Sequence, residues 1–223
     1  MTDSGDIAKS IGVALAQRIK GKGFRKRANS FNRLANDAIV HHVSVQLGSY
    51  DPTGMHAIPG LLPNLYGKYR VNFGVYVPGM DRMGAPRSSW INDYDCQLHW
   101  GLGNLMPGGS DRWWDLRDRL AVEEVGDLVM ALGVPKLDSF PDIESVLRAY
   151  ELDGEAAFGP VTSEAAALDV ADLLLSRGER GRALMLLKSY VEKMRTSNHV
   201  GHKTYLREYL VEREFHDLAA SDF

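Results

Sequence analysis

Two histidines, a serine and an aspartate in the first half of the chain are of types that can carry hydrolytic chemistry. His42 and Ser44 lie two residues apart, and Asp95 follows later in the chain. A serine nucleophile needs a base within hydrogen-bond reach and an acidic residue that orients this base. The chain has no Gly-x-Ser-x-Gly turn of the kind that exposes such a serine. The residue types therefore permit a catalytic triad, but their spacing does not indicate one.

The other histidines and the glycine-rich segment do not form a recognised metal or phosphate motif. His41 and His42 are neighbours, so on a strand they point to opposite faces. His199 and His202 have no glutamate between them and no cysteine nearby, unlike zinc motifs. The segment 101–109 follows a predicted strand but has no Lys-Ser/Thr pair of a phosphate loop. We therefore expect no metal and no cofactor.

Composition narrows the class of protein. The 223 residues carry a net charge of −3, which gives no overall attraction to nucleic acid or to an anionic membrane. The basic run 20–33 is typical of a solvated strand face. Cys96 is the single cysteine, which fits a reducing compartment. The first residues do not have the pattern of a signal peptide, and no apolar stretch of the sequence approaches the length of about 20 residues that spans a bilayer. These features predict a cytoplasmic protein that does not bind membranes or nucleic acid.

Hydrophobic periodicity predicts one helix followed by four strands. A four-residue repeat of apolar side chains marks the helix: Ile7, Ile11, Leu15 and Ile19. The strands are expected at 24–34 (with a bulge), 39–47, 71–77 and 95–102, with long loops at 51–67 and 78–89. We therefore predict an α+β fold with a four-stranded antiparallel meander sheet and the N-terminal helix on one face.

The remainder of the chain has a helical pattern. A helix over 122–132 is expected to end at Gly133 and Pro135, and Pro141 is expected to open the next one. Two glycines and a proline within 153–160 suggest a boundary. Beyond it, the pattern predicts a helical hairpin and a last helix over 204–218. We therefore predict an α+β domain over 1–152 and a helical subdomain over 161–223.

Several motifs over residues 5–150, taken in order, resemble a bacterial domain family of unknown function, numbered forty-three-oh-four. These motifs are Gly23-Phe24-Arg25-Lys26-Arg27 with Phe31, Val43-Ser44-Val45-Gln46, Val71-Asn72-Phe73-Gly74-Val75-Tyr76, Cys96 with Trp100-Gly101-Leu102-Gly103, and Asp111-Arg112-Trp113-Trp114. The resemblance implies the fold and a bacterial cytoplasmic setting, and it implies no activity.

Strand alternation predicts one polar face on the sheet. Its members are His42, Ser44, Gln46, Arg70, Asn72, Tyr76, Gln97 and His99. A face that combines hydrogen-bonding side chains with tyrosine suits a peptide edge or a polar ligand. The same alternation is also expected for a solvated face, or for a face under the C-terminal helices. Cys96 is expected on the opposite, apolar face, as a buried and inert thiol.

Trp113 and Trp114 form the second candidate surface. Adjacent residues cannot both enter one core layer, so we expect one indole to be buried and the other to be partly exposed. An exposed tryptophan beside Arg112 and Arg117 is suited to anchor a partner. The alternative is a corner that closes the end of the sheet.

The sequence favours a binding protein over an enzyme. We expect a protein partner, with an immunity or antitoxin-like protein that blocks a toxin as a concrete form. The alternative is a hydrolase or nuclease with a pocket around His42, Tyr76 and His99. Convergence of these three residues in a concave pocket would favour the enzyme.

Overall fold

The computed structural model describes residues 4–48, 64–80, 84, 86, 88–160, 166–221 and 223. These residues form two compact units, one of residues 1–78 with 84–162 and one of residues 79–83 with 163–223. Of the loops predicted at 51–67 and 78–89, residues 51–63, 81–83, 85 and 87 lie outside the described residues, as does the side chain of Ile7.

The first unit contains one antiparallel sheet. Its strands are β1 (Arg25–Arg27), β2 (Ser30–Leu34), β3 (Val40–Leu47), β4 (Lys68–Tyr76), β5 (Leu98–Gly101) and β6 (Trp114–Asp115). The order is β1-β2-β3-β4-β5, and β6 also pairs with β4. The α+β class and the antiparallel meander are therefore confirmed, with six strands in place of the predicted four.

The first predicted strand is wrong, because residues 25–34 form a hairpin. Arg27 pairs with Ser30, so only Ala28 and Asn29 remain in the turn. Ala28 has a φ of 52°, a left-handed conformation that tight hairpin turns require. Glycine and asparagine usually signal such a turn at this position, and alanine does not. The fourth predicted strand is also shorter, since the chain enters helix α2 (Leu102–Leu105) directly after β5.

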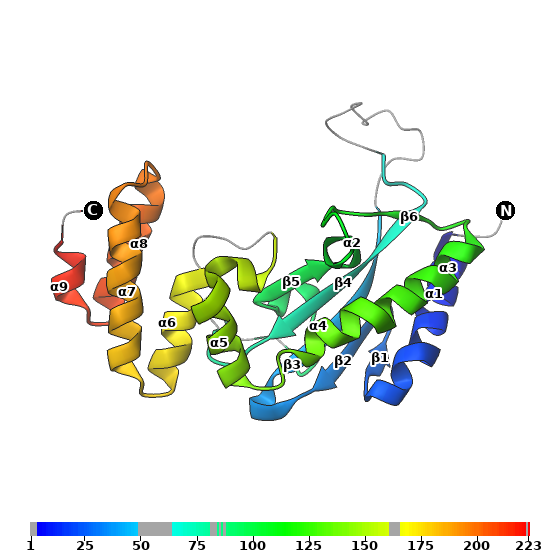
Figure 1. Ribbon diagram of the computed structural model, residues 1–223, viewed down its shortest axis with the longest axis horizontal. Coiled ribbons are helices and arrows are strands. Elements are labelled where there is room, and N and C mark those ends of the chain that lie inside the picture. Colours follow the sequence, from blue (N-terminus) through cyan, green and yellow to red (C-terminus); the bar gives the residue numbers. More distant parts are fainter. Residues whose placement is uncertain are drawn as a thin grey trace. The chain divides into compact units, whose positions relative to one another are not determined.

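Helices cover the apolar face of the sheet. Cross-strand partners on this face are Phe31, Val43, Phe73 and Trp100, all of them buried. Figure 1 shows α1 (Ser4–Ile19) beside α3 (Arg119–Leu128), and Arg18 forms ion pairs with Glu123 and Asp127 between these helices. The buried side chains of Ile11 and Leu15 confirm the apolar stripe of the first helix.

The helix predicted over 122–132 continues past its expected end. After α3 comes a π-helical turn, η4 (Val129–Gly133), and then α4 (Val134–Asp138). Pro135 stands in the first turn of α4, where a missing N–H is tolerated. Gly133 lies against the ring of Phe73, so it allows close packing and does not end the helix.

The predicted boundary at 153–160 belongs to the packed part of the first unit. Helix α5 (Ile143–Asp153) begins at Asp142, whose side chain accepts a hydrogen bond from the backbone N–H of Ser145 at 2.8 Å. The 3-10 helix η5 (Gly154–Phe158) follows and buries Ala157 and Phe158. Residues 154–160 therefore pack in the first unit, which ends at residue 162, just after the predicted boundary.

The second unit consists of helices in its described part. These are α6 (Ala166–Ser176), α7 (Arg180–Arg195), α8 (Val200–Glu212) and α9 (His216–Ala219). The predicted helical hairpin is present as α6 and α7. The last helix, predicted as one, is interrupted at Glu214, which has a φ of 61°.

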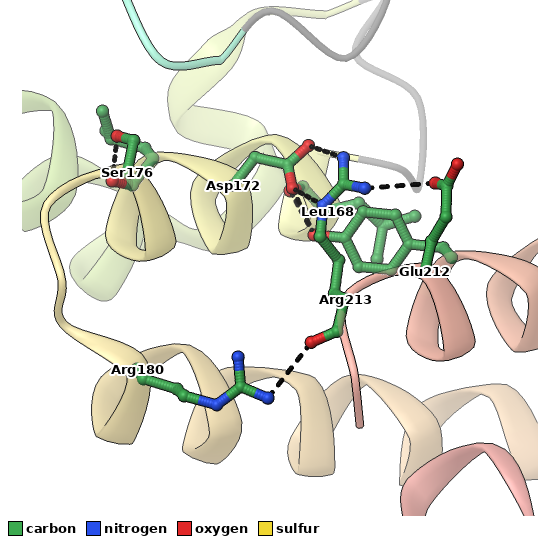
Figure 2. Close-up of polar contacts among 8 residues, drawn as sticks. Leu168, Asp172, Ser176, Arg180, Glu212 and Arg213 are labelled. Atoms are coloured by element: carbon green, nitrogen blue, oxygen red, sulfur yellow. Dashed lines mark hydrogen bonds and ion pairs between the residues drawn. The ribbon is translucent and has the colours of Figure 1, made fainter. Parts of the chain in front are cut away.

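A carboxylate on α6 holds the end of α8 (Figure 2). Asp172 Oδ1 accepts hydrogen bonds from the Tyr209 hydroxyl at 2.8 Å and from Arg213 Nε at 2.9 Å. Arg213 also pairs with Glu212, and Arg180 donates to the carbonyl oxygen of Arg213. Asp172 therefore connects two side chains of the C-terminal helices to α6.

Removal of the Asp172 carboxylate is expected to destabilise the second unit. In Asp172→Ala, Tyr209 and Arg213 lose their shared acceptor in a largely buried place, which costs about 2 kcal/mol of unfolding free energy. Glu212→Ala is the matched control, because Glu212 also pairs with Arg213 but lies mainly in solvent; its cost should stay below about 0.5 kcal/mol. Urea unfolding followed by circular dichroism measures both, and equal losses would contradict the role given to Asp172.

Candidate functional site

The register of the sheet places most of the predicted polar residues on one face. Across the strands, His42 is opposite Gly74 and Gly74 is opposite His99. Ser44 is opposite Asn72, and Gln46 is opposite Arg70. The backbone pairing therefore confirms that these polar side chains share a face, here called the polar face.

A segment of the first unit, residues 88–97 (the crossing segment), covers half of the polar face. Trp90 Nε1 donates to the Ser30 hydroxyl at 3.0 Å, and Asn32 Nδ2 donates to the Ile91 carbonyl oxygen at 3.0 Å. His42 lies in this half and is only 1% exposed. The polar face is therefore not an ordinary solvated face in this half, because a loop of the same unit covers it.

Cys96 lies on the polar side of the sheet, so its predicted position on the apolar face is wrong. Its sulfur occupies the space where a side chain on Gly74 would begin, 2.6 Å from that Cβ position. Strand β5 starts only at Leu98, so strand alternation does not extend back to Cys96. Burial raises the pKa of the Cys96 thiol well above its usual value, and the nearby Asp93 adds to this. The thiol is buried, as predicted, and the raised pKa disfavours its reactive thiolate form.

His42 has one ring nitrogen in a hydrogen bond and one without a described partner. Nδ1 lies 2.9 Å from Asn32 Oδ1 and donates to it, because Asn32 Nδ2 is already a donor to Ile91. Nε2 is buried and has no hydrogen-bond partner among the described residues. Burial lowers the pKa of His42, while the charge of Asp93 opposes this shift. His42 is therefore a neutral, buried histidine at neutral pH.

This burial predicts a loss of stability in mild acid. The pKa of His42 in the folded state lies below 6.5, its value in an unfolded chain. The unfolded state then binds more protons as the pH falls through 6.5, so the unfolding free energy decreases. His41 contributes in the same direction, because burial lowers its pKa as well. Urea unfolding between about pH 8 and about pH 5.5 measures the loss. It should be smaller in His42→Gln, and an unchanged pH dependence in this variant would contradict the assignment.

The other half of the polar face is hollowed into a cleft of about 230 Å³, here called the polar cleft. It is lined by Arg70, Asn72, Phe73, Asp93, His99, Trp100, Gly101, Asn104 and Pro160. Strands β4 and β5 supply most of this lining, and the crossing segment supplies Asp93. Three of the predicted residues, Arg70, Asn72 and His99, therefore converge in one cavity.

Arg70 is held in place by a network at the edge of the polar cleft. Its Nε donates to Gln46 Oε1 at 2.8 Å, and the same oxygen accepts from Asn72 Nδ2 at 2.9 Å. Its Nη1 donates to Asp111 at 3.2 Å. The guanidinium lies 5.0 Å above the ring of Trp113, whose Nε1 also donates to Asp111. This network joins the two candidate surfaces that the sequence predicted separately.

A backbone contact fixes the orientation of the His99 ring. Its Nε2 lies 2.5 Å from the carbonyl oxygen of Cys96, so Nε2 carries the proton and donates. In the neutral ring Nδ1 is then an acceptor. Gly159, with a φ of 121°, lies directly against the carbonyl oxygen of His99 on the other side. The position of His99 therefore depends on the packing of residues 154–160.

The remaining predicted residues do not line the polar cleft. Ser44 is half-buried between Ser30 and Asn72, and Tyr76 lies at the far end of β4, opposite Val40. Gln97 donates to the Asp95 carbonyl oxygen and accepts from the backbone of Val77. Trp114 is buried against Tyr69, while Trp113 is half-exposed. One buried and one partly exposed indole is the arrangement expected for two adjacent tryptophans.

The histidine motifs considered for chemistry have structural partners. His42 bonds to Asn32, while Asp95 accepts from the backbone of Asn92, so neither makes a triad contact with the other. His41 Nε2 donates to the Phe140 carbonyl oxygen at 2.8 Å. His202 Nε2 lies 2.6 Å from the Tyr190 hydroxyl. The described ranges hold no group of three or more His, Cys, Asp or Glu side chains suited to a metal ion.

Sequence reasoning missed several residues of the site: Asp93, Tyr94, Asn104 and Asp111. Asn92 and Asp95 form a capping box that starts the 3-10 helix η3 (Asp93–Asp95), and their N-x-x-D spacing is a signal for it. Asn104 Oδ1 accepts from the backbone of Gly101 at 2.9 Å, which is also a local cap. These residues could have been recognised as turn formers, but not as neighbours of Arg70.

The second unit has a cavity of its own, of about 460 Å³. It is lined by Arg180, Gly181, Leu184, Glu214, Phe215, His216, Asp217 and Leu218. Arg180 donates to the carbonyl oxygens of Arg213 and Glu214 and lies 4.3 Å above the Phe215 ring. Its cation is therefore used to hold the turn between α8 and α9.

Comparisons with protein-family models, with curated proteins and with solved structures gave no match to this chain. The resemblance to the bacterial domain family therefore stays a prediction. None of the helices in the described residues is long and apolar enough to cross a lipid bilayer.

Proposed function

We propose that this chain is a binding protein that recognises a protein partner at the polar cleft and at the aromatic residues beside it. The observation that carries the proposal is the convergence of Arg70, Asn72 and His99 in one cavity next to the half-exposed ring of Trp113. An immunity or antitoxin-like protein, which acts by covering a toxin, is the form of binder we favour.

The side chains beside the polar cleft are of the kinds that dominate protein interfaces. Tyr94 is 83% exposed and directly follows Asp93, which lines the cleft. Trp113 lies under Arg70, and both are partly exposed. Tryptophan, tyrosine and arginine are the residues most enriched in interface hot spots. An exposed tyrosine and a stacked tryptophan-arginine pair around a cavity support an interface in which one partner side chain enters the cleft.

The three residues of the enzyme hypothesis are not gathered in the polar cleft. His99 lines it, whereas His42 is buried under the crossing segment and Tyr76 lies toward the opposite end of β4. This arrangement favours binding over hydrolysis at this site.

The test is a partner capture that compares variants. The purified chain serves as bait in a lysate of its source organism, and mass spectrometry compares wild type with Trp113→Ala and Tyr94→Ala. We expect both variants to lose a partner that wild type retains, because interface aromatics often contribute about 2 kcal/mol or more, or at least tenfold in affinity.

Leu120→Ala is the matched control for this capture. Leu120 is as exposed as Tyr94 but stands on α3, in the helical layer on the other face of the sheet. The partner should remain bound to Leu120→Ala. A partner that is retained equally by all variants, or lost only from Leu120→Ala, would contradict the proposed surface.

A further inference from the structure

The charges around the polar cleft do not balance. Arg70 is paired with Asp111, so the positive charge of the cleft is already compensated. Asp93 has no ion-pair partner among the described residues, and its Oδ1 is buried without a hydrogen bond there. A carboxylate without a partner costs free energy that a nearby cation would recover. The cleft therefore carries one uncompensated negative charge.

Three side chains of the polar cleft carry acceptor atoms that make no hydrogen bond to the described residues. Asn72 donates one of its two amide N–H groups to Gln46, and its carbonyl oxygen is an acceptor that makes no bond to the described residues. His99 donates through Nε2 to Cys96, which leaves Nδ1 as an acceptor. Together with the carboxylate of Asp93, three acceptors line one cavity. A ligand that satisfies these three acceptors supplies hydrogen-bond donors, and a cation also satisfies the charge of Asp93.

The size of the polar cleft limits the ligand to a side chain. Its volume of about 230 Å³ is below the range of roughly 300 to 1,000 Å³ that is usual for whole small-molecule ligands. A single side chain with a polar end fits such a space.

We propose that the polar cleft accepts a positively charged side chain, a guanidinium or an ammonium group, from the protein partner. The inference rests on the proposed function, because that function supplies the partner. The cation would lie beside Asp93, while Asn72 and His99 accept its N–H groups. Arg70 stays paired with Asp111 and does not oppose the cation with an open charge.

The test uses small probes and needs no identified partner. The full-length protein, labelled with nitrogen-15, is titrated with Nα-acetylarginine methylamide, with the lysine counterpart and with the citrulline counterpart. Citrulline has nearly the shape of arginine but no charge. We expect at least one cationic probe to bind about fivefold more tightly than citrulline, with shifts of the Asn72 side-chain amide and of the Gly101 backbone amide.

Asp93→Asn is the matching variant, since it removes the charge and keeps the shape. In this variant the cationic probes should bind no more tightly than the citrulline probe. Asp153→Asn, on the exposed end of α5, should leave the preference unchanged. Equal binding of all probes, binding of none, or a preference that survives in Asp93→Asn would overturn the inference. If a partner is still lost from Trp113→Ala in that case, only the cationic group is wrong and the proposed function stands.

Discussion

Gly159→Ala is expected to cost the first unit about 3 to 5 kcal/mol of unfolding free energy. Gly159 has a φ of 121° and a ψ of 172°, a region that is essentially open to glycine alone. A Cβ built there would lie 1.8 Å from the carbonyl oxygen of His99, which is backbone and cannot rotate away. Either the segment 154–160 leaves the sheet or β5 shifts, and both changes disturb the polar cleft.

Gly154→Ala separates the cost of backbone strain from the cost of the steric clash. Gly154 also has a positive φ, 60° with a ψ of −139°, but nothing lies within 4 Å of its Cβ position. We expect about 1 to 2 kcal/mol from backbone strain alone. Thermal and urea unfolding measure both variants. Equal losses would show that the close approach of Gly159 to His99 has no energetic weight.

Gly133→Ala is the second substitution with a large expected effect, about 3 kcal/mol of lost stability. Gly133 has helical angles, φ −70° and ψ −50°, so alanine is favourable for the backbone itself. The added Cβ would lie 2.1 Å from Phe73 Cζ, and Phe73 is fully buried in the middle of β4. The loss therefore comes from overpacking between the helical layer and the sheet.

A second substitution in the same contact tests this cause. Phe73→Leu replaces the aromatic ring by a smaller side chain and makes room for the added methyl group. The double variant Gly133→Ala with Phe73→Leu should therefore be more stable than the sum of the single losses predicts, by about 1 kcal/mol or more. Gly181→Ala on α7, where nothing lies within 4 Å, should instead gain about 0.5 to 1 kcal/mol. If the stability losses of Gly133→Ala and Phe73→Leu simply add in the double variant, overpacking is not the cause of the loss.

The fold was predictable where the residue pattern has a regular period. The alternation in 39–47 and 71–77 identified β3 and β4 and placed His42, Gln46 and Asn72 on the correct face. It failed where local conformation depends on a few backbone angles. The left-handed conformation of Ala28 turns one predicted strand into a hairpin, and that of Glu214 divides one predicted helix.

The candidate site was predictable only in part, because its members come from distant segments. The pairing of β4 with β5 brings Asn72 and His99 onto the same face, and strand alternation predicts this arrangement. The position of Asp93 depends on the path of the crossing segment over β4. The spacing of residues within that segment does not determine this path. For the same reason, the burial of His42 could not be inferred from its polar strand face.

The most direct test of the polar cleft as the binding surface is a site-specific photo-crosslink. A photoreactive phenylalanine analogue replaces Tyr94 beside the cleft, or Leu120 on the helical layer, and the two positions are equally exposed at 83%. After irradiation in a lysate of the source organism, we expect a covalent adduct with one partner at position 94 and none at position 120. An adduct at 120 alone, or at neither position, would contradict it.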